Sequence, residues 1–260
     1  MLDYEAEAAV YDATRGGTPR AEAAAEAVLT LVPAGARTLL DIACGTGIVT
    51  ERLVRPGLRT VGADAAHGMA RKAVARMAGA IVLADVRRLP LPDASVDAVG
   101  AIWLLHMLPQ PWTVVAEAAR VLRPGGVFIT TVDKDEGHDV GSDIDAVLAP
   151  HRSRNPSDRA DLIERYAAGH GMRPVGEASF TGYGQGRTPS ATAEDVLLGR
   201  YASRLAVRGA AAERLAGELV ALPAPGIRRP DPVHRLIAFG AGRPGANSSG
   251  ASGQRQPALR

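Results

Sequence analysis

Short apolar runs alternate with amphipathic segments over most of the chain, and this alternation predicts the fold. Buried strands are expected at residues 38–44, 59–64, 80–85, 96–105 and 126–132. Between them, apolar residues recur at helical spacing, most clearly at residues 67–78 and 112–122. Strand–helix alternation of this kind is typical of a parallel, doubly wound sheet with helices on both faces.

The same pattern divides the rest of the chain. Residues 1–36 are helical in pattern, with the clearest helix at 21–32, and we expect them to form an N-terminal lid. Later elements are expected as a helix at 158–171, a strand at 173–184, helices at 193–206 and 210–222, and a last strand at 233–242. Thr192, with Asp195 three residues on, resembles a capping box that opens the helix at 193–206.

This pattern predicts a core at residues 37–185 and 230–243 with a helical cap inserted at 186–229. The segment 244–260 has few large apolar residues, and we expect it to be disordered.

Composition narrows the class of protein. With 260 residues, 46% hydrophobic and 22% charged, the chain fits one large folded domain. No apolar run is long enough to span a bilayer and charges occur throughout the first twenty residues, so we expect a cytoplasmic protein. The single cysteine, Cys44, excludes an internal disulfide and a Cys-rich zinc site. A net charge of +2 gives no sign of a surface that coats nucleic acid.

The strongest chemical signal is a glycine turn within residues 38–53, which are predicted as a buried strand, the turn and then a helix. Gly45 and Gly47 allow a tight turn and a close approach of ligand to backbone. The spacing G-x-G-x-x-G is not completed, because Thr50 stands at its last position. Asp41 would repel a pyrophosphate seated on the turn but suits a ligand with an ammonium group, which disfavours nicotinamide and flavin cofactors.

Two further aspartates close the next two strands. Asp64 ends the second strand, where an acid can accept hydrogen bonds from ribose hydroxyls, and Asp85 ends the third. Each alone could be a turn or cap aspartate. Together with Asp41 they line the ligand crevice of a parallel sheet, and they favour a ligand with an amino group, a ribose and a base.

The motifs DIACGTG (41–47), VGAD (61–64), LADVRRLPLPDASVDAV (83–99) and ARVLRPGGVFI (119–129) resemble those of class I S-adenosylmethionine-dependent methyltransferases, in order. The resemblance covers residues 38–132 and is nearest to the branch that methylates ubiquinone and menaquinone. It implies an α/β, Rossmann-like doubly wound sheet, mostly parallel with an antiparallel last strand, and a small helical cap. One departure is Ala43, where many members have glycine.

The resemblance also implies the cofactor, S-adenosylmethionine, with S-adenosylhomocysteine as product, and residue roles. Asp41 would orient the methionyl amino group and Asp64 would hold the ribose hydroxyls. Asp85 would bind the adenine amino group. The residues expected to line the turn or adjoin the adenosine are Ala43, Cys44, Gly45, Gly47, Ala65, Met69 and Val86.

The end of the fourth predicted strand carries two candidates for the reaction centre, Trp103 and His106, and the loop after the fifth strand carries a third, His138. His106 is the candidate general base, and the alternative is a histidine that packs the loop. His138 is the second-choice base. Trp103 would wall the cofactor or acceptor pocket, or be a core tryptophan.

The N-terminal segment and the loop after the fifth strand each leave two interpretations open. Tyr11 and Arg15 could lie across the cofactor, with the Tyr11 ring near the sulfonium, or belong to a surface helix with a local Asp12–Arg15 pair. The acidic loop at 133–139 invites a metal interpretation, but a solvated loop is favoured and no metal is expected.

We therefore expect a methyltransferase that acts on a small molecule, at oxygen rather than nitrogen, as a monomer or homodimer without nucleic-acid or membrane partners. The arginine- and alanine-rich composition suggests an actinobacterial origin and a role in secondary metabolism. The alternatives are a cyclase-like protein that binds the cofactor without transfer, and a peptide or nucleic-acid methyltransferase.

Overall fold

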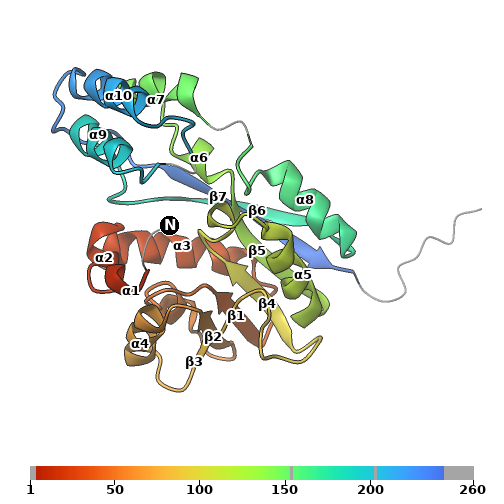
Figure 1. Ribbon diagram of the computed structural model, residues 1–260. Helices are drawn as coiled ribbons and strands as arrows, with labels where there is room; N and C mark the ends of the chain where they lie inside the picture. Colours follow the sequence, from red (N-terminus) through yellow and green to blue (C-terminus); the bar gives the residue numbers. More distant parts are fainter. Residues whose placement is uncertain (1–3, 153–154, 202–203, 243–260) are drawn as a thin grey trace, which may run out of the picture.

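A seven-stranded sheet forms the centre of the computed structural model, which describes residues 4–152, 155–201 and 204–242 (Figure 1). The predicted tail lies outside the described residues. The strand order is β3-β2-β1-β4-β5-β7-β6. Only β7 runs antiparallel to its neighbours, as expected for the last strand. The strands are β1 Thr38–Ile42, β2 Arg59–Asp64, β3 Ile81–Leu83, β4 Val96–Ala101, β5 Leu122–Val132, β6 Met172–Thr181 and β7 Val233–Ala241.

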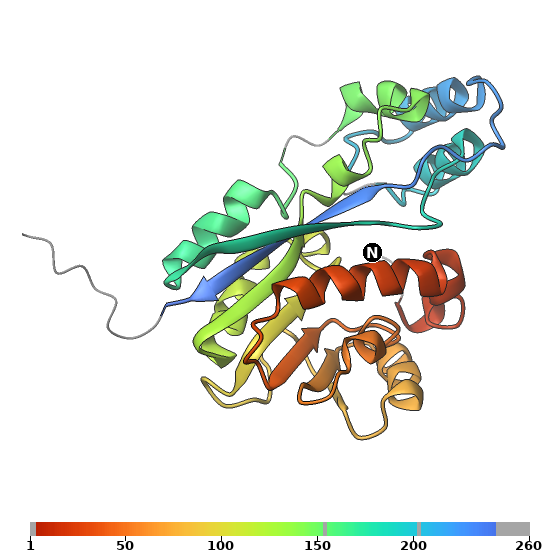
Figure 2. The same ribbon diagram turned by 180° about the vertical axis from the view of Figure 1, so that it is seen from behind.

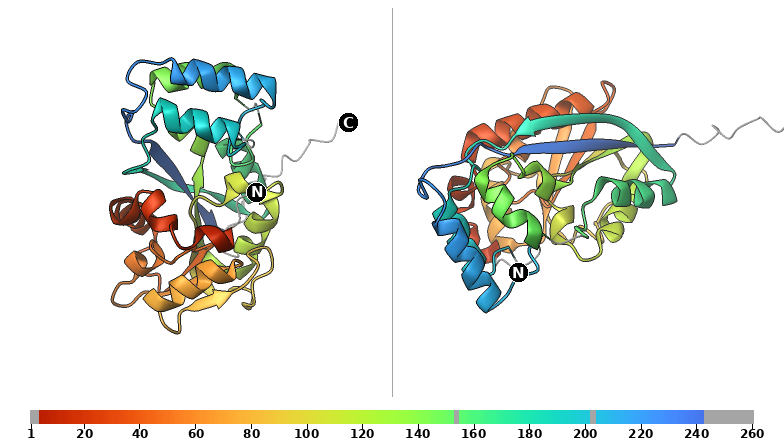
Figure 3. Two further views of the ribbon diagram at one scale, coloured as in Figure 1. Left: turned by 60° about the vertical axis from the view of Figure 1, so that its left-hand side comes forward. Right: turned by 90° about the horizontal axis from the view of Figure 1, so that it is seen from above.

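Helices cover both faces of this sheet. The α-helices are α1 Tyr4–Glu7, α2 Tyr11–Thr14, α3 Gly17–Leu31, α4 His67–Arg76, α5 Pro111–Val121, α6 Lys134–Gly137, α7 Asp143–Leu148, α8 Ala160–Gly169, α9 Pro189–Leu197 and α10 Ala210–Val220. The short 3₁₀ helices are η1 Thr50–Leu53, η2 Leu105–Met107 and η3 Ala149–His151. α3 packs on one face while α5 and α8 pack on the other (Figure 3). The prediction of an α/β doubly wound sheet is confirmed.

The central strands are buried on both faces, which explains why they could be predicted from continuous apolar runs. Leu39 and Ile42 of β1 are fully buried, one on each face, because successive strand side chains point to opposite sides. β1 lies between β2 and β4, with Asp41 in register with Gly62 and Gly100. The carboxyl ends of β1, β2 and β4 therefore meet at one edge, where parallel α/β sheets bind ligands.

Helices α7, α9 and α10 lie together beyond that edge, apart from the sheet (Figure 2). A separate apolar cluster joins α9 and α10, which are within the predicted cap, to α7, which precedes it. Its largest buried members are Ile144, Leu148, Leu205, Leu215 and Leu219. The sequence pattern did not include α7 in the cap.

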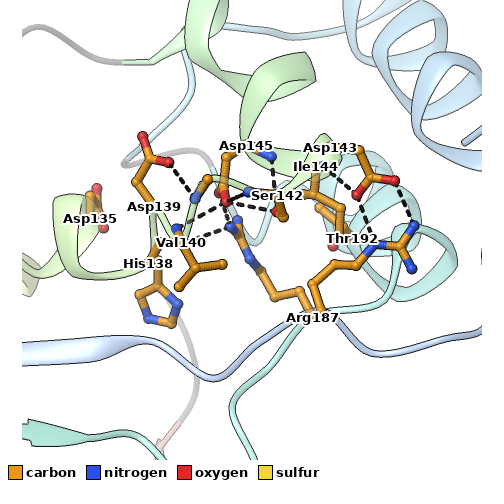
Figure 4. A network of polar contacts seen from close by, with 12 residues as sticks. Asp135, His138, Asp139, Val140, Ser142, Asp143, Ile144, Asp145, Arg187 and Thr192 are labelled. Atoms are coloured by element: carbon orange, nitrogen blue, oxygen red, sulfur yellow. Dashed lines mark hydrogen bonds and ion pairs between the residues drawn. The ribbon is translucent and has the colours of Figure 1, made fainter.

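Polar contacts fix α7 to the segment before α9 (Figure 4). The buried carboxylate of Asp145 accepts hydrogen bonds from the Val140 and Ser142 backbone amides and pairs with Arg187. Arg229 donates two hydrogen bonds of 2.7 Å to Asp143. The contacts of Asp145 with Arg187 and of Asp143 with Arg229 join segments that the sequence separates by more than forty residues.

The predicted start of the helix at 193–206 is wrong. Thr188, not Thr192, caps α9: its side chain accepts a hydrogen bond from Ala191 N, and Pro189 occupies the first helical turn. Thr192 lies inside the helix and donates to Thr188 O at 2.7 Å. The proline after Thr188 favours a helix start there, because its fixed φ and missing N–H suit the first turn.

The predicted helix after the glycine turn is only the 3₁₀ turn η1. Pro56 disfavours helical backbone at Arg55, and Gly57 turns the chain at φ +82° toward β2. The chain thus returns to the sheet without a full helix.

Gly16 brings the start of α3 against the segment between β6 and α9. Gly16 has φ +91°, and a Cβ built on it would lie 2.0 Å from Tyr183 O. A Cβ built on Gly184 would lie 3.1 Å from Gly16 Cα. Neither position has room for a side chain.

A search of the described residues finds no helix with the length and apolar character needed to cross a membrane.

Candidate cofactor and acceptor site

The turn after β1 has left-handed backbone at three positions. Ala43, Gly45 and Gly47 have φ values of +55°, +58° and +75°. A Cβ on Gly45 would meet nothing within 4 Å, so this part of the turn borders open space. A Cβ on Gly47 would lie 3.0 Å from both Cα and Cβ of Ala73 in α4. Gly45 thus leaves room for a ligand, whereas Gly47 allows α4 to approach.

Asp41 lies at the base of this turn and is 3% exposed. Its carboxylate accepts a 2.6 Å hydrogen bond from Thr50 Oγ1. Burial raises the pKa of Asp41 to about 7, and the Thr50 bond only partly opposes that shift. None of the described residues forms an ion pair with Asp41, so a cationic ligand would compensate its charge.

Asp64 fixes the turn from the end of β2. Its two oxygens accept hydrogen bonds of 2.8 Å from Gly45 N and Ala66 N. Burial raises the pKa of Asp64, while these backbone bonds oppose the shift. Each oxygen retains a second lone pair, so Asp64 can hold the turn and accept further hydrogen bonds.

The residues predicted beside the adenosine lie near this edge with different exposure. Asp85 is exposed and pairs with Arg87 at 2.6 Å, and this contact lowers the pKa of Asp85. Ala65 is exposed, whereas Met69 on α4 and Val86 are buried.

Cys44 is an inert member of the turn. It is buried, and burial together with the charge of Asp41 raises the pKa of its thiol. A thiol held in the protonated form is a poor nucleophile. Its environment suits a lining residue and argues against a catalytic thiol.

The N-terminal segment is bound to the same turn through Asp12. Its two oxygens accept hydrogen bonds of 2.6 Å, one from Thr46 Oγ1 and one from Arg76 of α4. Asp12 therefore pairs with Arg76 and not with Arg15, which contradicts the alternative of a local Asp12–Arg15 pair. Arg15 lies instead over the ring of Tyr11, 5.7 Å from its centroid.

Trp103 is buried after β4 at φ +56°. The Arg20 guanidinium lies 4.1 Å from its ring centroid, and the rings of Phe180 and His234 contact it edge-on at 5.4 and 5.5 Å. It is a core residue on the α3 face, although its indole N–H has no hydrogen-bond partner among the described residues.

His106 lies in η2, directly beyond Trp103. Burial lowers its pKa well below the ordinary value, and the charges of Lys134 and Arg204 lower it further. The pKa values of His138 and His234 are lowered for the same main reason. Their rings contact each other with centroids 5.4 Å apart. The histidines at this edge are therefore neutral near pH 7.

The acidic loop after β5 is joined to arginines. Asp135 pairs with Arg204 at 2.6 Å and Asp139 pairs with Arg152 at 2.6 Å. In the described parts of the chain, no three His, Cys, Asp or Glu side chains are grouped so that they could hold a metal ion.

Several residues at this edge were missed by sequence reasoning. They are Arg20, Thr46, Thr50, Lys134, Asp158, Arg204 and His234. His234 could have been found from the topology. The first residues of an antiparallel last strand lie at the carboxyl edge of the parallel strands. Arg235, the next residue after His234, is in register with Val132 at the end of β5. Thr46 and Thr50 lie in or just after the glycine turn, but nothing in the sequence indicates their partners. Arg20, Lys134, Asp158 and Arg204 carry no local signal.

The turn fits the cofactor that the sequence motifs imply. The open space at Gly45 accepts a ligand against the backbone, and the buried carboxylate of Asp41 would compensate an ammonium group. Asp64 offers free lone pairs one strand away.

Comparisons with known proteins agree with this geometry. The family described as "Methyltransferase domain" matches residues 40–130, which run from β1 through β5. An uncharacterized methyltransferase of Mycobacterium tuberculosis is 41% identical over 102 residues, which are 39% of this chain and 42% of that protein.

Two curated relatives have named reactions. The 27-O-demethylrifamycin SV methyltransferase of Amycolatopsis mediterranei is 41% identical over 34% of this chain and 35% of its own. The ubiquinone biosynthesis O-methyltransferase of Hahella chejuensis is 34% identical over 38% of this chain and 44% of its own. The chain thus spans less than half of each relative's length.

Solved structures share the fold. The [4+2]-cyclase SpnF has a TM-score of 0.58 at 18% identity, over 92% of this chain and 94% of its own. The geranyl diphosphate C-methyltransferase of Streptomyces coelicolor, solved with S-adenosyl-L-homocysteine, has a TM-score of 0.50 at 16% identity, over 84% and 78%. With the motif-bearing turn, the strand order and the family match together, residues 40–130 form a methyltransferase domain with the fold of the class I S-adenosylmethionine-dependent enzymes.

Proposed function

We propose that the protein transfers a methyl group from S-adenosylmethionine to an oxygen atom of a small molecule. The observation that carries this proposal is the buried Asp41 carboxylate beside the glycine turn. A buried carboxylate without a cationic partner is costly, and the ammonium group of this cofactor supplies one. The donor contributes an activated methyl group on a sulfonium when bound.

The protein's own residues bind and orient the cofactor and exclude water from the site. Asp41 holds the ammonium group, Asp64 accepts from the ribose hydroxyls, and Asp85 accepts from the adenine amino group after exchanging its contact with Arg87. Ala43, Gly45 and Gly47 line the turn, with Tyr11 and Arg15 over it as a lid. Alignment in a water-free site can supply about 7–11 kcal/mol in favourable intramolecular reactions.

The choice of a small acceptor and of oxygen is supported by the cap and the relatives. α7, α9 and α10 form a separate cluster over the carboxyl edge and provide a wall for an acceptor pocket. Two relatives are named as acting at oxygen, one of them on a rifamycin. We propose tailoring of a secondary metabolite by extension from that relative.

Calorimetric titration with S-adenosylhomocysteine tests the cofactor site. Asp64→Asn should weaken binding by about 1–3 kcal/mol, because the amide cannot replace all of the acceptor bonds. Asp161→Asn is the matched control, because Asp161 is an exposed carboxylate on α8 away from the turn. Equal affinities in the wild type and Asp64→Asn would contradict the assignment.

Formation of S-adenosylhomocysteine with a panel of small phenols, acids and amines tests transfer. Cofactor binding without any product across this panel would favour the cyclase-like alternative.

His106 is proposed as the base that takes the acceptor's proton. His106→Ala should lower turnover by about 10²-fold, the lower end for general bases, because a lowered pKa weakens the base. Cofactor affinity should stay unchanged. Unchanged turnover would remove this role and leave His138 as the next candidate.

A further inference from the structure

Buried polar atoms without hydrogen-bond partners gather in one region of the described structure. They are Arg15 Nε, Arg20 Nε, Trp103 Nε1, His106 Nδ1, Asp135 Oδ1, Asp158 Oδ1 and His234 Nδ1. These atoms belong to segments that meet at the carboxyl edge: the end of α2, the start of α3, the ends of β4 and β5, the segment before α8 and the start of β7. Asp135 Oδ1 has an ion-pair partner, Arg204 Nε at 2.6 Å, so six of these atoms are left without a polar partner among the described residues. Folded proteins leave few such atoms, so their gathering in one region calls for a polar occupant.

The unmet demand is mainly for a hydrogen-bond acceptor. The nitrogens of Arg15, Arg20 and Trp103 can only donate. Asp135 Oδ1 is compensated by Arg204 Nε at 2.6 Å. The other oxygen of Asp158 accepts from Lys134 N at 3.0 Å. An occupant rich in acceptor atoms would therefore satisfy more of the region than one rich in donors.

The region also has an excess of positive charge. Neither Lys134 nor Arg15 forms an ion pair with any residue that the structure describes, and Arg204 has Asp135 as partner. Burial lowers the pKa of Lys134 to about 7. The positive charges of Arg204 and Arg15 lower this pKa further, whereas the negative charges of Asp135 and Asp158 oppose the shift. The charges of Lys134 and Arg204 also lower the pKa values of His106, His138 and His234. An anion bound here would relieve this repulsion.

Lys134 is held in place by its backbone. Its own N–H donates to Asp158 Oδ2, and the preceding amide, Asp133 N, donates to Asp158 O at 2.9 Å. Lys134 follows the end of β5 by two positions, and β5 lies beside β4, which lies beside β1. A group bound to Lys134 therefore stands two strands away from the glycine turn, at the same edge.

We propose that the methyl acceptor carries an anionic oxygen group, which Lys134 and Arg15 bind at the carboxyl edge beyond β5. This inference rests on the proposed methyl transfer and deepens it, because it names the chemical class of the acceptor. Holding the anion at one end of a small molecule would direct the other end toward the donor methyl group.

Binding measurements at neutral pH on protein saturated with S-adenosylhomocysteine test the proposal. The probes are benzoate, hexanoate and phenyl phosphate, with benzamide and hexanamide as uncharged partners and inorganic phosphate as a bare anion. At least one organic anion should bind about tenfold more tightly than its uncharged partner, as expected for a charge-assisted hydrogen bond. Phenyl phosphate against benzoate distinguishes a phosphate site from a carboxylate site.

Lys134→Gln should reduce the preference for the anion to below about threefold. Arg165→Gln removes a charge from the exposed face of α8 and should leave the preference unchanged. If Lys134→Gln does not fold, Arg15→Gln provides the same test. Normal binding of S-adenosylhomocysteine verifies folding of the wild type, Lys134→Gln and Arg165→Gln. For Arg15→Gln the circular dichroism spectrum verifies folding, because Arg15 is also proposed to lie over the cofactor.

Three outcomes would overturn the proposal: amides that bind as tightly as the acids, a preference that survives both substitutions, or no organic anion bound at about 10 mM. Tight binding of inorganic phosphate alone would also overturn it. Failure to bind S-adenosylhomocysteine would instead contradict the proposed function, so the two failures are distinguishable.

Discussion

Asp12 and Thr46 are joined by a 2.6 Å hydrogen bond between their side chains, although thirty-four positions separate them. Arg76 extends this contact: it donates to Asp12 and, at 2.5 Å, to Thr46 O. The short helix α2 is thereby tied to both the glycine turn and α4. The N-terminal segment thus helps to position the cofactor turn.

Asp12→Asn should loosen this connection, because an amide cannot form the ion pair with Arg76. We expect S-adenosylhomocysteine affinity to fall by about 1–3 kcal/mol and hydrogen exchange of the turn amides to accelerate. Glu22→Gln removes an exposed carboxylate on α3 and should change neither quantity. Unaltered exchange at residues 44–47 would contradict the positioning role.

Cofactor binding should release a proton from Asp41. Its pKa is raised to about 7, so the folded protein holds this proton between about pH 4 and 7 where the unfolded chain has lost it. This group alone therefore lowers the free energy of unfolding as pH rises through that window. An ammonium ligand favours the ionised form, so affinity should increase as pH rises toward 7.

Titration calorimetry in two buffers of different ionisation enthalpy measures this release. The wild type should show a buffer-dependent heat near pH 6, and Asp41→Asn should lose the part of that heat due to Asp41. Identical heats in the two buffers for the wild type would rule the release out.

Ala43→Gly should stabilise the protein. An alanine at φ +55° has left-handed backbone that costs about 1 kcal/mol, and glycine removes that cost. Ala94→Gly tests the same effect at φ +50° away from the turn, whereas Ala221→Gly, at φ −73°, should stabilise nothing. Denaturant unfolding measures the change, and a loss of stability in Ala43→Gly would contradict it.

Gly47→Ala and Gly45→Ala should differ. At Gly47 a methyl group combines left-handed strain with a 3.0 Å contact to Ala73, and we expect a loss of more than about 2 kcal/mol in the free energy of unfolding. Gly45→Ala has only the strain, about 1–2 kcal/mol, but places its methyl group in the ligand space and should weaken cofactor binding.

The double variant Gly47→Ala/Ala73→Gly separates contact from strain. Relative to Ala73→Gly alone, it should recover the part of the loss that is due to contact with the Cβ of Ala73, while the contact with its Cα remains. No recovery relative to that single variant would mean that the Cβ contact contributes nothing to the cost.

Local patterns predicted the sheet because buried strands appear as continuous apolar runs. The glycine turn and its three aspartates could be predicted equally well, since each aspartate lies within two positions of the carboxyl end of a strand. The pattern failed where two local signals competed, as at Thr188-Pro189 against Thr192, and where a proline shortened the helix after the turn. The partners of Asp12, Lys134 and Arg204 could not be predicted, because they depend on how distant segments meet.

The close approach of Gly16 and Gly184 sets the start of α3 against the connection between β6 and α9. Because neither residue has a side chain, the two backbones touch directly. If α2 covers the donor and α9 borders the acceptor, as proposed, a displacement of one segment should displace the other. Entry of the acceptor and enclosure of the donor would then be coupled through this one contact.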